Sequence, residues 1–261
     1  MAVTADKLER RSYAAGVGFY AVCAGVTLWM TNGMAGGMAM PGGWTMSMVW
    51  MRMPGQSGAA AAAMFTAMWA AMMVAMMLPS TWPMLRMYQR VTAFRGEPHA
   101  GTLPWLMGVA YFAVWTAFGG LAYAGGRLVA VAAMTSEPLS RTVPVLGGVG
   151  LVIGGAYQFT PWKAACLTHC RSPLEILERH LTPGWRGAVR VGLHHGAFCV
   201  ACCWGLMAMQ LIVGVMNIPM MVVIGLIIAA EKQLAHPAWI ARSVGCVAIL
   251  AGVGIIVRGA L

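Results

Sequence analysis

Long stretches of apolar residues recur along the whole chain and restrict the folds open to it. Seven of them are long enough, or nearly so, to cross the roughly 30 Å of bilayer hydrocarbon at about 1.5 Å per helical residue. The chain is 60% hydrophobic and 9% charged, whereas a soluble domain carries about 25% charged residues, so its surface must face lipid. The apolar segments are 12–30, 59–85, 103–130, 143–162, 189–216, 218–234 and 239–257.

These segments predict an all-α fold, a polytopic transmembrane helix bundle of about seven spans within a single integral membrane domain, residues 1–261. The division between the fifth and sixth spans rests on Asn217 and Pro219, a short turn signal. If that turn is only a kink, six spans remain. Residues 31–58, rich in methionine and glycine, are expected to form an outer loop.

A cytoplasmic surface segment is expected at residues 171–188. Ser172, Pro173 and Glu175 have the pattern of a helix start, with an N-cap, proline in the first turn and an acidic residue that closes a capping box. Leucines on one face of this short helix predict that it lies in the membrane interface.

Positive charges are distributed unevenly between the segments. With a cytoplasmic N-terminus, thirteen of the seventeen lysines and arginines fall on the cytoplasmic side. The positive-inside rule therefore predicts a cytoplasmic N-terminus and, with seven spans, an outer C-terminus. The net charge of +10 does not indicate nucleic-acid binding, because the charges are scattered singly and form no basic patch.

Soft metal ligands are concentrated between Gln158 and Trp204, which hold five of the seven cysteines. A first cluster consists of Cys166, His169 and Cys170. The spacing i, i+3, i+4 predicts that all three project from one side of a helix, where they could hold a metal with a fourth ligand from elsewhere.

A second cluster lies in the fifth span. His195, Cys199 and Cys202 fall on one helical face, with Cys203 beside them. Because the connection 171–188 is short, the fourth and fifth spans should be neighbours and the two clusters should meet near the inner leaflet. A bound metal is the simplest explanation; inert packing and redox disulfide chemistry stay open, although a reducing cytoplasm disfavours a structural disulfide.

Methionines suggest a path for a soft cation. Thioether sulfur suits Cu(I) and needs no deprotonation. Methionine is also a flexible packing residue, so packing remains the alternative. The candidate path residues are Met38 and Met40 in the outer loop and Met64, Met68, Met72 and Met76 at four-residue spacing in the second span.

Two polar residues near the cytoplasmic end are candidates for a proton or charge site. Glu231 is the one acidic residue expected within a span, and an intramembrane acid is usually functional or paired. Gln158 precedes the first cluster. An interfacial ion pair that involves Lys232 is the alternative for Glu231.

The chain resembles an uncharacterised bacterial family of predicted metal-binding integral membrane proteins, a domain of unknown function. The resemblance covers most of the chain from the second span onward. It implies metal binding and a place in the bacterial inner (cytoplasmic) membrane. It is carried by W-x2-MM-x-AMM-x-P from Trp69 to Pro79, Q-x-TP-x-K-x2-CL-x2-C from Gln158 to Cys170, C-x2-CCW from Cys199 to Trp204, and Glu231-Lys232.

Two functions are compatible with these features. The first is an integral membrane protein that binds or transports a soft transition metal, with copper favoured over zinc or iron. Its partners would be the lipid bilayer and a protein that donates the metal or joins it in the membrane. The second is a membrane-embedded metalloenzyme that acts on a small or lipid-soluble substrate, which predicts an apolar cavity beside the metal.

Overall fold

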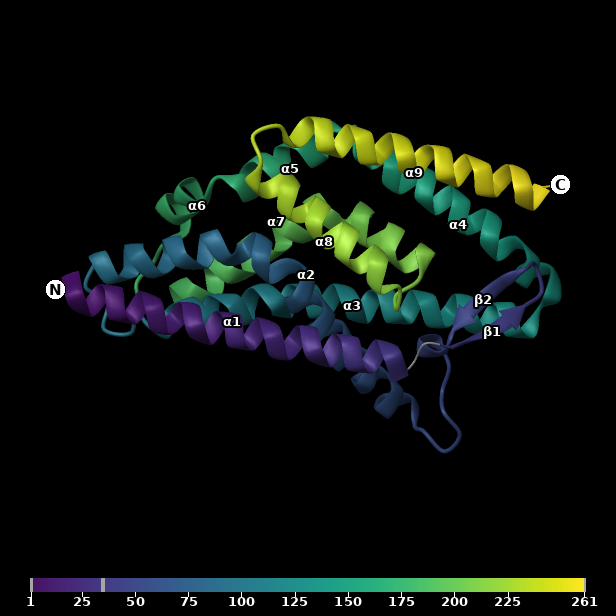
Figure 1. The fold of residues 1–261 in the computed structure, drawn as a ribbon, viewed down its shortest axis with the longest axis horizontal. Coiled ribbons are helices and arrows are strands. Elements are labelled where there is room, and N and C mark those ends of the chain that lie inside the picture. The colour runs from purple at the N-terminus through teal and green to yellow at the C-terminus, as the bar shows by residue number, and fades with distance from the viewer. Residues whose placement is uncertain (1, 34–35, 261) are drawn as a thin grey trace.

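The computed structural model describes residues 2–33 and 36–260, so residues 34 and 35 of the expected outer loop lie outside the described part. Within it, the predicted all-α bundle is confirmed (Figure 1). The helices are α1 (Ala2–Gly33), α2 (Gly58–Phe94), α3 (Leu103–Thr135), α4 (Glu137–Tyr157), α5 (Pro161–Arg171), α6 (Pro173–His180), α7 (Gly184–Val213), α8 (Ile218–Gln233) and α9 (Pro237–Ala260).

Six of the described helices, α1, α2, α3, α4, α7 and α9, are long and apolar enough to cross a membrane. The turn predicted at Asn217 does separate α7 from α8, and Asn217 caps α8 through a side-chain bond to the amide of Met220. With 16 residues, α8 is about 24 Å long and falls short of the roughly 30 Å needed to span a bilayer alone. The two ends of the chain lie at opposite ends of the long axis (Figure 1).

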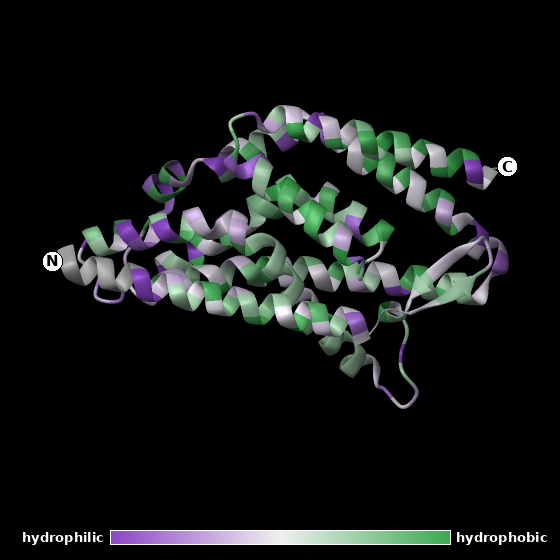
Figure 2. Ribbon diagram, in the orientation of Figure 1, coloured by the Kyte–Doolittle hydropathy of each residue, from purple (hydrophilic) through white to green (hydrophobic). Residues whose placement is uncertain are grey.

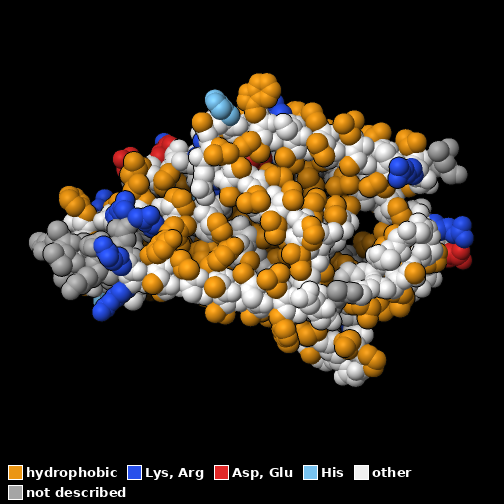
Figure 3. All heavy atoms as spheres, viewed as in Figure 1, with side chains coloured by type: hydrophobic (Ala, Val, Ile, Leu, Met, Phe, Trp, Pro, Cys, Tyr) orange, Lys and Arg blue, Asp and Glu red, His pale blue; other side chains and the backbone are white. Residues whose placement is uncertain are grey.

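The hydropathy of the residues varies along the long axis of the bundle. Hydrophilic residues gather toward the two ends and hydrophobic ones fill the middle (Figure 2). On the face drawn in Figure 3, lysines and arginines cluster mostly at the end that holds the N-terminus, and apolar side chains cover the centre. This pattern is typical of a bundle that crosses a bilayer.

Helix α2 continues through Pro79 and Pro83 to Phe94 instead of ending near them. Pro83 has no amide hydrogen, so the carbonyl of Pro79 loses its helical donor. Nε2 of Gln233 on α8 donates to this carbonyl at 3.1 Å. The neighbouring helix thus satisfies the freed group, as a proline-containing membrane helix requires.

The segment between α1 and α2 contains more structure than the loop expected at 31–58. Strands β1 (Gly37–Met40) and β2 (Trp44–Ser47) pair antiparallel, followed by the 3-10 turn η1 (Met48–Trp50). Gly42 and Gly43 have φ of 100° and 74°, a conformation that glycine adopts without strain. The indole of Trp44 donates to the carbonyl of Ser140 at 2.9 Å, so the hairpin is fixed to α4.

Close approach of α3 and α7 positions the site described below. A Cβ on Gly192 would lie 2.3 Å from the carbonyl oxygen of Met107, and one on Gly196 would lie 3.0 Å from that of Tyr111. Small residues at such contacts let membrane helices pack backbone to backbone. The side chain of Tyr111 on α3 therefore contacts the cysteines of α7.

Candidate metal centre

Three buried thiols lie together on one face of α7. Cys199, Cys202 and Cys203 are at most 1% exposed, and their sulfur atoms all lie within 4.8 Å of one another. Their spacing i, i+3, i+4 places them on one helical face. They are the one group of three or more metal-ligating side chains of this compactness in the described part of the chain.

Helix α5 adds thiols from a second direction. Sγ of Cys170 lies 3.9 Å from Sγ of Cys202, and Cys166 belongs to the same buried cluster. The side chain of Thr160 caps α5 through the amide of Lys163, and Pro161 occupies its first turn, which fixes where the helix starts. The two groups of cysteines thus lie side by side.

The sulfur atoms sit in a dry environment. Burial raises the pKa of the Cys166 thiol. A thiol must lose its proton to bind a metal as thiolate, so metal binding at Cys166 would release a proton. Donors of this softness suit Cu(I), and thiolates also hold zinc or iron.

His195 enters this region, whereas His169 does not. The His195 ring is 2% exposed and stacks on Tyr111 with 5.4 Å between ring centroids. Its Nδ1 has no hydrogen-bond partner among the described residues. His169 turns away from Cys170 instead: its Nε2 lies 2.9 Å from Nε2 of His194.

The different direction of His169 does not follow from spacing alone, because Cys199, Cys202 and Cys203 have the same spacing and their sulfur atoms converge. At about 100° per residue, positions i+3 and i+4 lie on opposite flanks of position i. Cys166 and Cys170 face the core, and His169, partly exposed, faces the junction with α6 and α7. Burial lowers the pKa of His169, Glu175 opposes that change, and the nearby His180 and Arg179 add to it.

Two further residues contact Cys199. Nζ of Lys232 lies 2.9 Å and the hydroxyl of Tyr111 lies 3.0 Å from its Sγ. An adjacent ammonium favours the thiolate over the thiol. The sequence placed Lys232 only in a motif and a possible interfacial ion pair, and it did not single out Tyr111; both are buried at the sulfur cluster.

A buried ion pair lies beside the cysteines. Nζ of Lys163 contacts Oε1 of Glu231 at 2.6 Å, both side chains being 1% exposed, and it also donates to Oε1 of Gln158. Oε2 of Glu231 lacks a hydrogen-bond partner in the part of the chain described. Sequence reasoning named Glu231 and Gln158 but missed Lys163, which joins them; the lysine of the Q-x-TP-x-K motif was the available signal.

The methionines of the candidate path divide into three environments. Met68, Met72 and Met76 are buried in the same core cluster as the five cysteines. Met38 and Met64 are exposed, while Met40 is buried with Met46 in a separate cluster under the hairpin. A cavity of about 420 Å³ lies at the N-terminal end of α2. The methionines that line it are Met48, Met51, Met53, Met64 and Met68.

One comparison with known proteins gives a match. A family model described as "PpoB2: Copper chaperone" matches residues 66–255, well over half of the chain and a range that contains all five clustered cysteines. No curated protein and no solved structure matches.

Proposed function

The chain belongs to the PpoB2 copper chaperone family, and from this premise we propose that it binds copper as Cu(I) at the cluster of Cys199, Cys202 and Cys203. The metal is the cargo of the protein. The observation that carries the proposal is the compact group of three buried sulfur atoms with Cys170 at 3.9 Å from Cys202. Buried thiolates from two helices supply the soft, water-free ligand set that Cu(I) prefers.

Charge at the cluster supports this assignment. A single copper ion held by three thiolates leaves a net negative charge, which is costly in an apolar interior. The ammonium of Lys232, 2.9 Å from Cys199, offsets part of that charge. The phenol of Tyr111 provides a further polar contact to the same sulfur.

We propose that copper reaches the cluster along the sulfur atoms of α2. The methionine-lined cavity lies at the N-terminal end of that helix, and Met68, Met72 and Met76 continue the series to the core cluster of the cysteines. Thioethers bind Cu(I) weakly enough to release it and lie on the way to stronger thiolates. The direction of movement in this proposal is from outside to inside.

The proposed setting is the bacterial inner membrane, with the N-terminus in the cytoplasm and the C-terminus outside. The uneven distribution of lysine and arginine supports the cytoplasmic N-terminus, and the position of the two ends of the chain at opposite ends of the long axis supports an outer C-terminus (Figure 1). The thiol cluster would then lie toward the cytoplasmic leaflet, where a reducing environment keeps cysteines free. A soluble or membrane protein that exchanges copper with the cluster is the proposed partner.

The test is a copper assay on the full chain purified in detergent under reducing conditions. We expect stoichiometric Cu(I) that resists a moderate chelator in the wild type, and its loss in Cys199→Ser/Cys202→Ser/Cys203→Ser. Cys23→Ser/Cys246→Ser is the matched control, because these two cysteines lie outside the cluster. Equal copper in the wild type and the triple variant would overturn the proposal.

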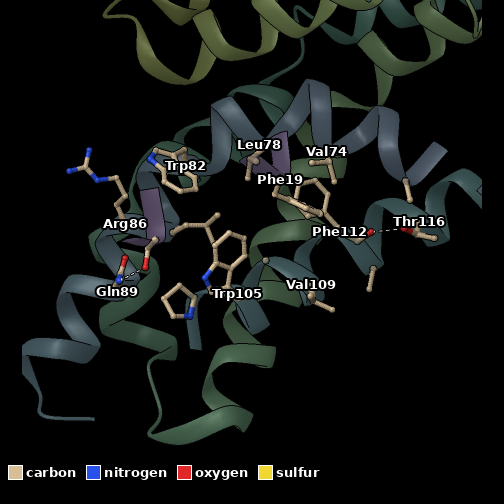
Figure 4. Close-up of a pocket in the computed structure, with 16 residues that line it drawn as sticks. Phe19, Val74, Leu78, Trp82, Arg86, Gln89, Trp105, Val109, Phe112 and Thr116 are labelled. Carbon is tan, nitrogen blue, oxygen red and sulfur yellow. Dashed lines mark hydrogen bonds between the residues drawn. The ribbon is translucent and has the colours of Figure 1, made fainter. Parts of the chain in front are cut away.

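The alternative of a metalloenzyme gains less support from the cavities. The larger apolar cavity, about 670 Å³, lies between α1, α2 and α3 and is lined by Phe19, Val74 and Trp105 among others (Figure 4). None of the five clustered cysteines lines it. Phe112 lines this cavity, whereas the adjacent Tyr111 contacts Cys199, so α3 stands between the cavity and the sulfur atoms.

A further inference from the structure

Three histidines gather where α5, α6 and α7 meet, outside the sulfur cluster. Nε2 of His169 lies 2.9 Å from Nε2 of His194. The ring of His180 lies against that of His194, with 4.1 Å between centroids. Each of the three side chains is partly exposed, so an ion can reach them from solution.

Each histidine is presented by a different helix. His169 lies in the last turn of α5, His180 is the last residue of α6, and His194 lies in α7. Phe198, one turn beyond His194, contacts two of the rings, at 4.0 Å from His169 and 4.8 Å from His194 between centroids. The ring of Phe198 therefore forms an apolar surface against the imidazoles of His169 and His194.

The two nearest nitrogens lie at hydrogen-bond distance, and a small separation of the rings would make room for a shared metal ion. Zinc binds imidazole nitrogen at about 2.0–2.1 Å in tetrahedral sites, which separates two such nitrogens by about 3.3 Å. The 2.9 Å between His169 and His194 is within a few tenths of an ångström of this value. The ring of His180 lies tilted against that of His194, and rotation of its side chain would bring a third nitrogen to the ion.

We propose that His169, His180 and His194 form a second metal site that uses nitrogen alone and takes borderline divalent ions such as Zn(II), Co(II) or Cu(II). Imidazole suits these ions, whereas the buried thiols favour soft Cu(I). His169 adjoins Cys170 in the chain and Phe198 adjoins Cys199. The histidine site therefore lies next to the sulfur cluster and is more exposed than it. It does not depend on copper binding at the cysteines.

Cobalt(II) distinguishes the two sites by absorption. Cobalt on thiolates gives an intense sulfur-to-metal charge-transfer band in the near ultraviolet, and cobalt on imidazole gives only weaker ligand-field bands. We titrate the full chain in detergent with Co(II), under reducing and anaerobic conditions. We expect the wild type to show ligand-field absorption that Cys199→Ser/Cys202→Ser/Cys203→Ser retains.

The histidine variants decide the assignment. His169→Ala/His180→Ala/His194→Ala should lose the sulfur-independent absorption, whereas the control His99→Ala/His236→Ala, the two histidines on other segments, should keep it. Where the triple variant does not stay monodisperse, His180→Gln at the partly exposed end of α6 decides, with an expected affinity loss of about tenfold. Unchanged cobalt affinity in His180→Gln, or wild-type absorption in the folded triple variant, would refute the site.

The outcomes also separate this site from the copper proposal. Ligand-field absorption in the wild type without any charge-transfer band would show that the thiols do not bind cobalt, and it would leave the histidine site supported. Cobalt bound to thiolates also has ligand-field bands, so visible absorption that disappears completely in Cys199→Ser/Cys202→Ser/Cys203→Ser would count against the histidine site alone. Absence of all cobalt absorption from the wild type would overturn the histidine site, whatever the copper assay gives.

Discussion

Nζ of Lys232 lies 2.9 Å from Sγ of Cys199, and both side chains are buried. In Lys232→Met the negative charge of a copper–thiolate complex would lose its counter-charge. A change of about 1.4 kcal/mol corresponds to tenfold in affinity, and we expect Cu(I) to bind at least about tenfold more weakly. Competition titration against a colorimetric Cu(I) chelator measures this.

Lys232→Arg is the control for that variant, since it keeps the positive charge. We expect it to retain most of the affinity. If Lys232→Met bound Cu(I) as tightly as the wild type or more tightly, the ammonium would be competing with the metal and not supporting it.

The ion pair of Lys163 and Glu231 predicts a non-additive effect on stability. Removal of one partner leaves a buried charge without compensation, which costs about 3–5 kcal/mol, and both side chains are 1% exposed. We expect Lys163→Met to lower the unfolding midpoint strongly and Lys163→Met/Glu231→Gln to recover part of the loss. Detergent-solubilised thermal unfolding measures both; equal losses in the single and double variants would contradict the coupling.

The helix bundle could be predicted from the sequence because a membrane-spanning segment must be long and apolar, and a helix satisfies its backbone hydrogen-bonding groups internally. A local turn signal, Asn217 and Pro219, located the turn between α7 and α8, which the structure contains. The hairpin at 37–47 was missed, since its methionines and glycines carry no strong strand pattern, and its anchoring to Ser140 depends on contacts 96 and 99 residues away in sequence.

The sequence predicted only part of the candidate site. The side-by-side arrangement of Cys170 and Cys202 followed from the short connection between their helices. The partners of Lys163 and Cys199 did not follow, because pairs separated by 68 and 88 residues leave no local pattern. The direction of His169 was missed because its three-residue step from Cys166 equals that of Cys202 from Cys199, and only its contact with His194 on another helix distinguishes the two.

The close contact of α3 and α7 depends on the absence of a side chain at Gly192. A Cβ there would lie 2.3 Å from a backbone oxygen of α3, so Gly192→Ala must separate the helices. Overpacking of this kind costs about 1–3 kcal/mol, and we expect both lower thermal stability and weaker Cu(I) binding, because Tyr111 moves from Cys199. Gly120→Ala on α3, where no atom lies within 4 Å of the added carbon, should change neither quantity; equal effects of the two variants would argue against the close contact.

The methionines of α2 can be tested without disturbing the packing, because leucine has a similar volume. Met→Leu exchanges usually cost less than about 1.5 kcal/mol, and leucine has no sulfur to bind copper. For Met68→Leu/Met72→Leu/Met76→Leu we expect near wild-type unfolding and equilibrium Cu(I) affinity, but slower copper entry into proteoliposomes. The path predicts a kinetic defect because the thioethers are intermediate ligands and not the final site.

Met84→Leu/Met107→Leu provides the matched control for packing. Both methionines are buried, but in a second core cluster that contains none of the five clustered cysteines. We expect copper entry at the wild-type rate in this variant. If the two sets of variants slowed entry equally, or if neither did, the methionines of α2 would act only as packing residues, and copper would reach Cys199 by another way.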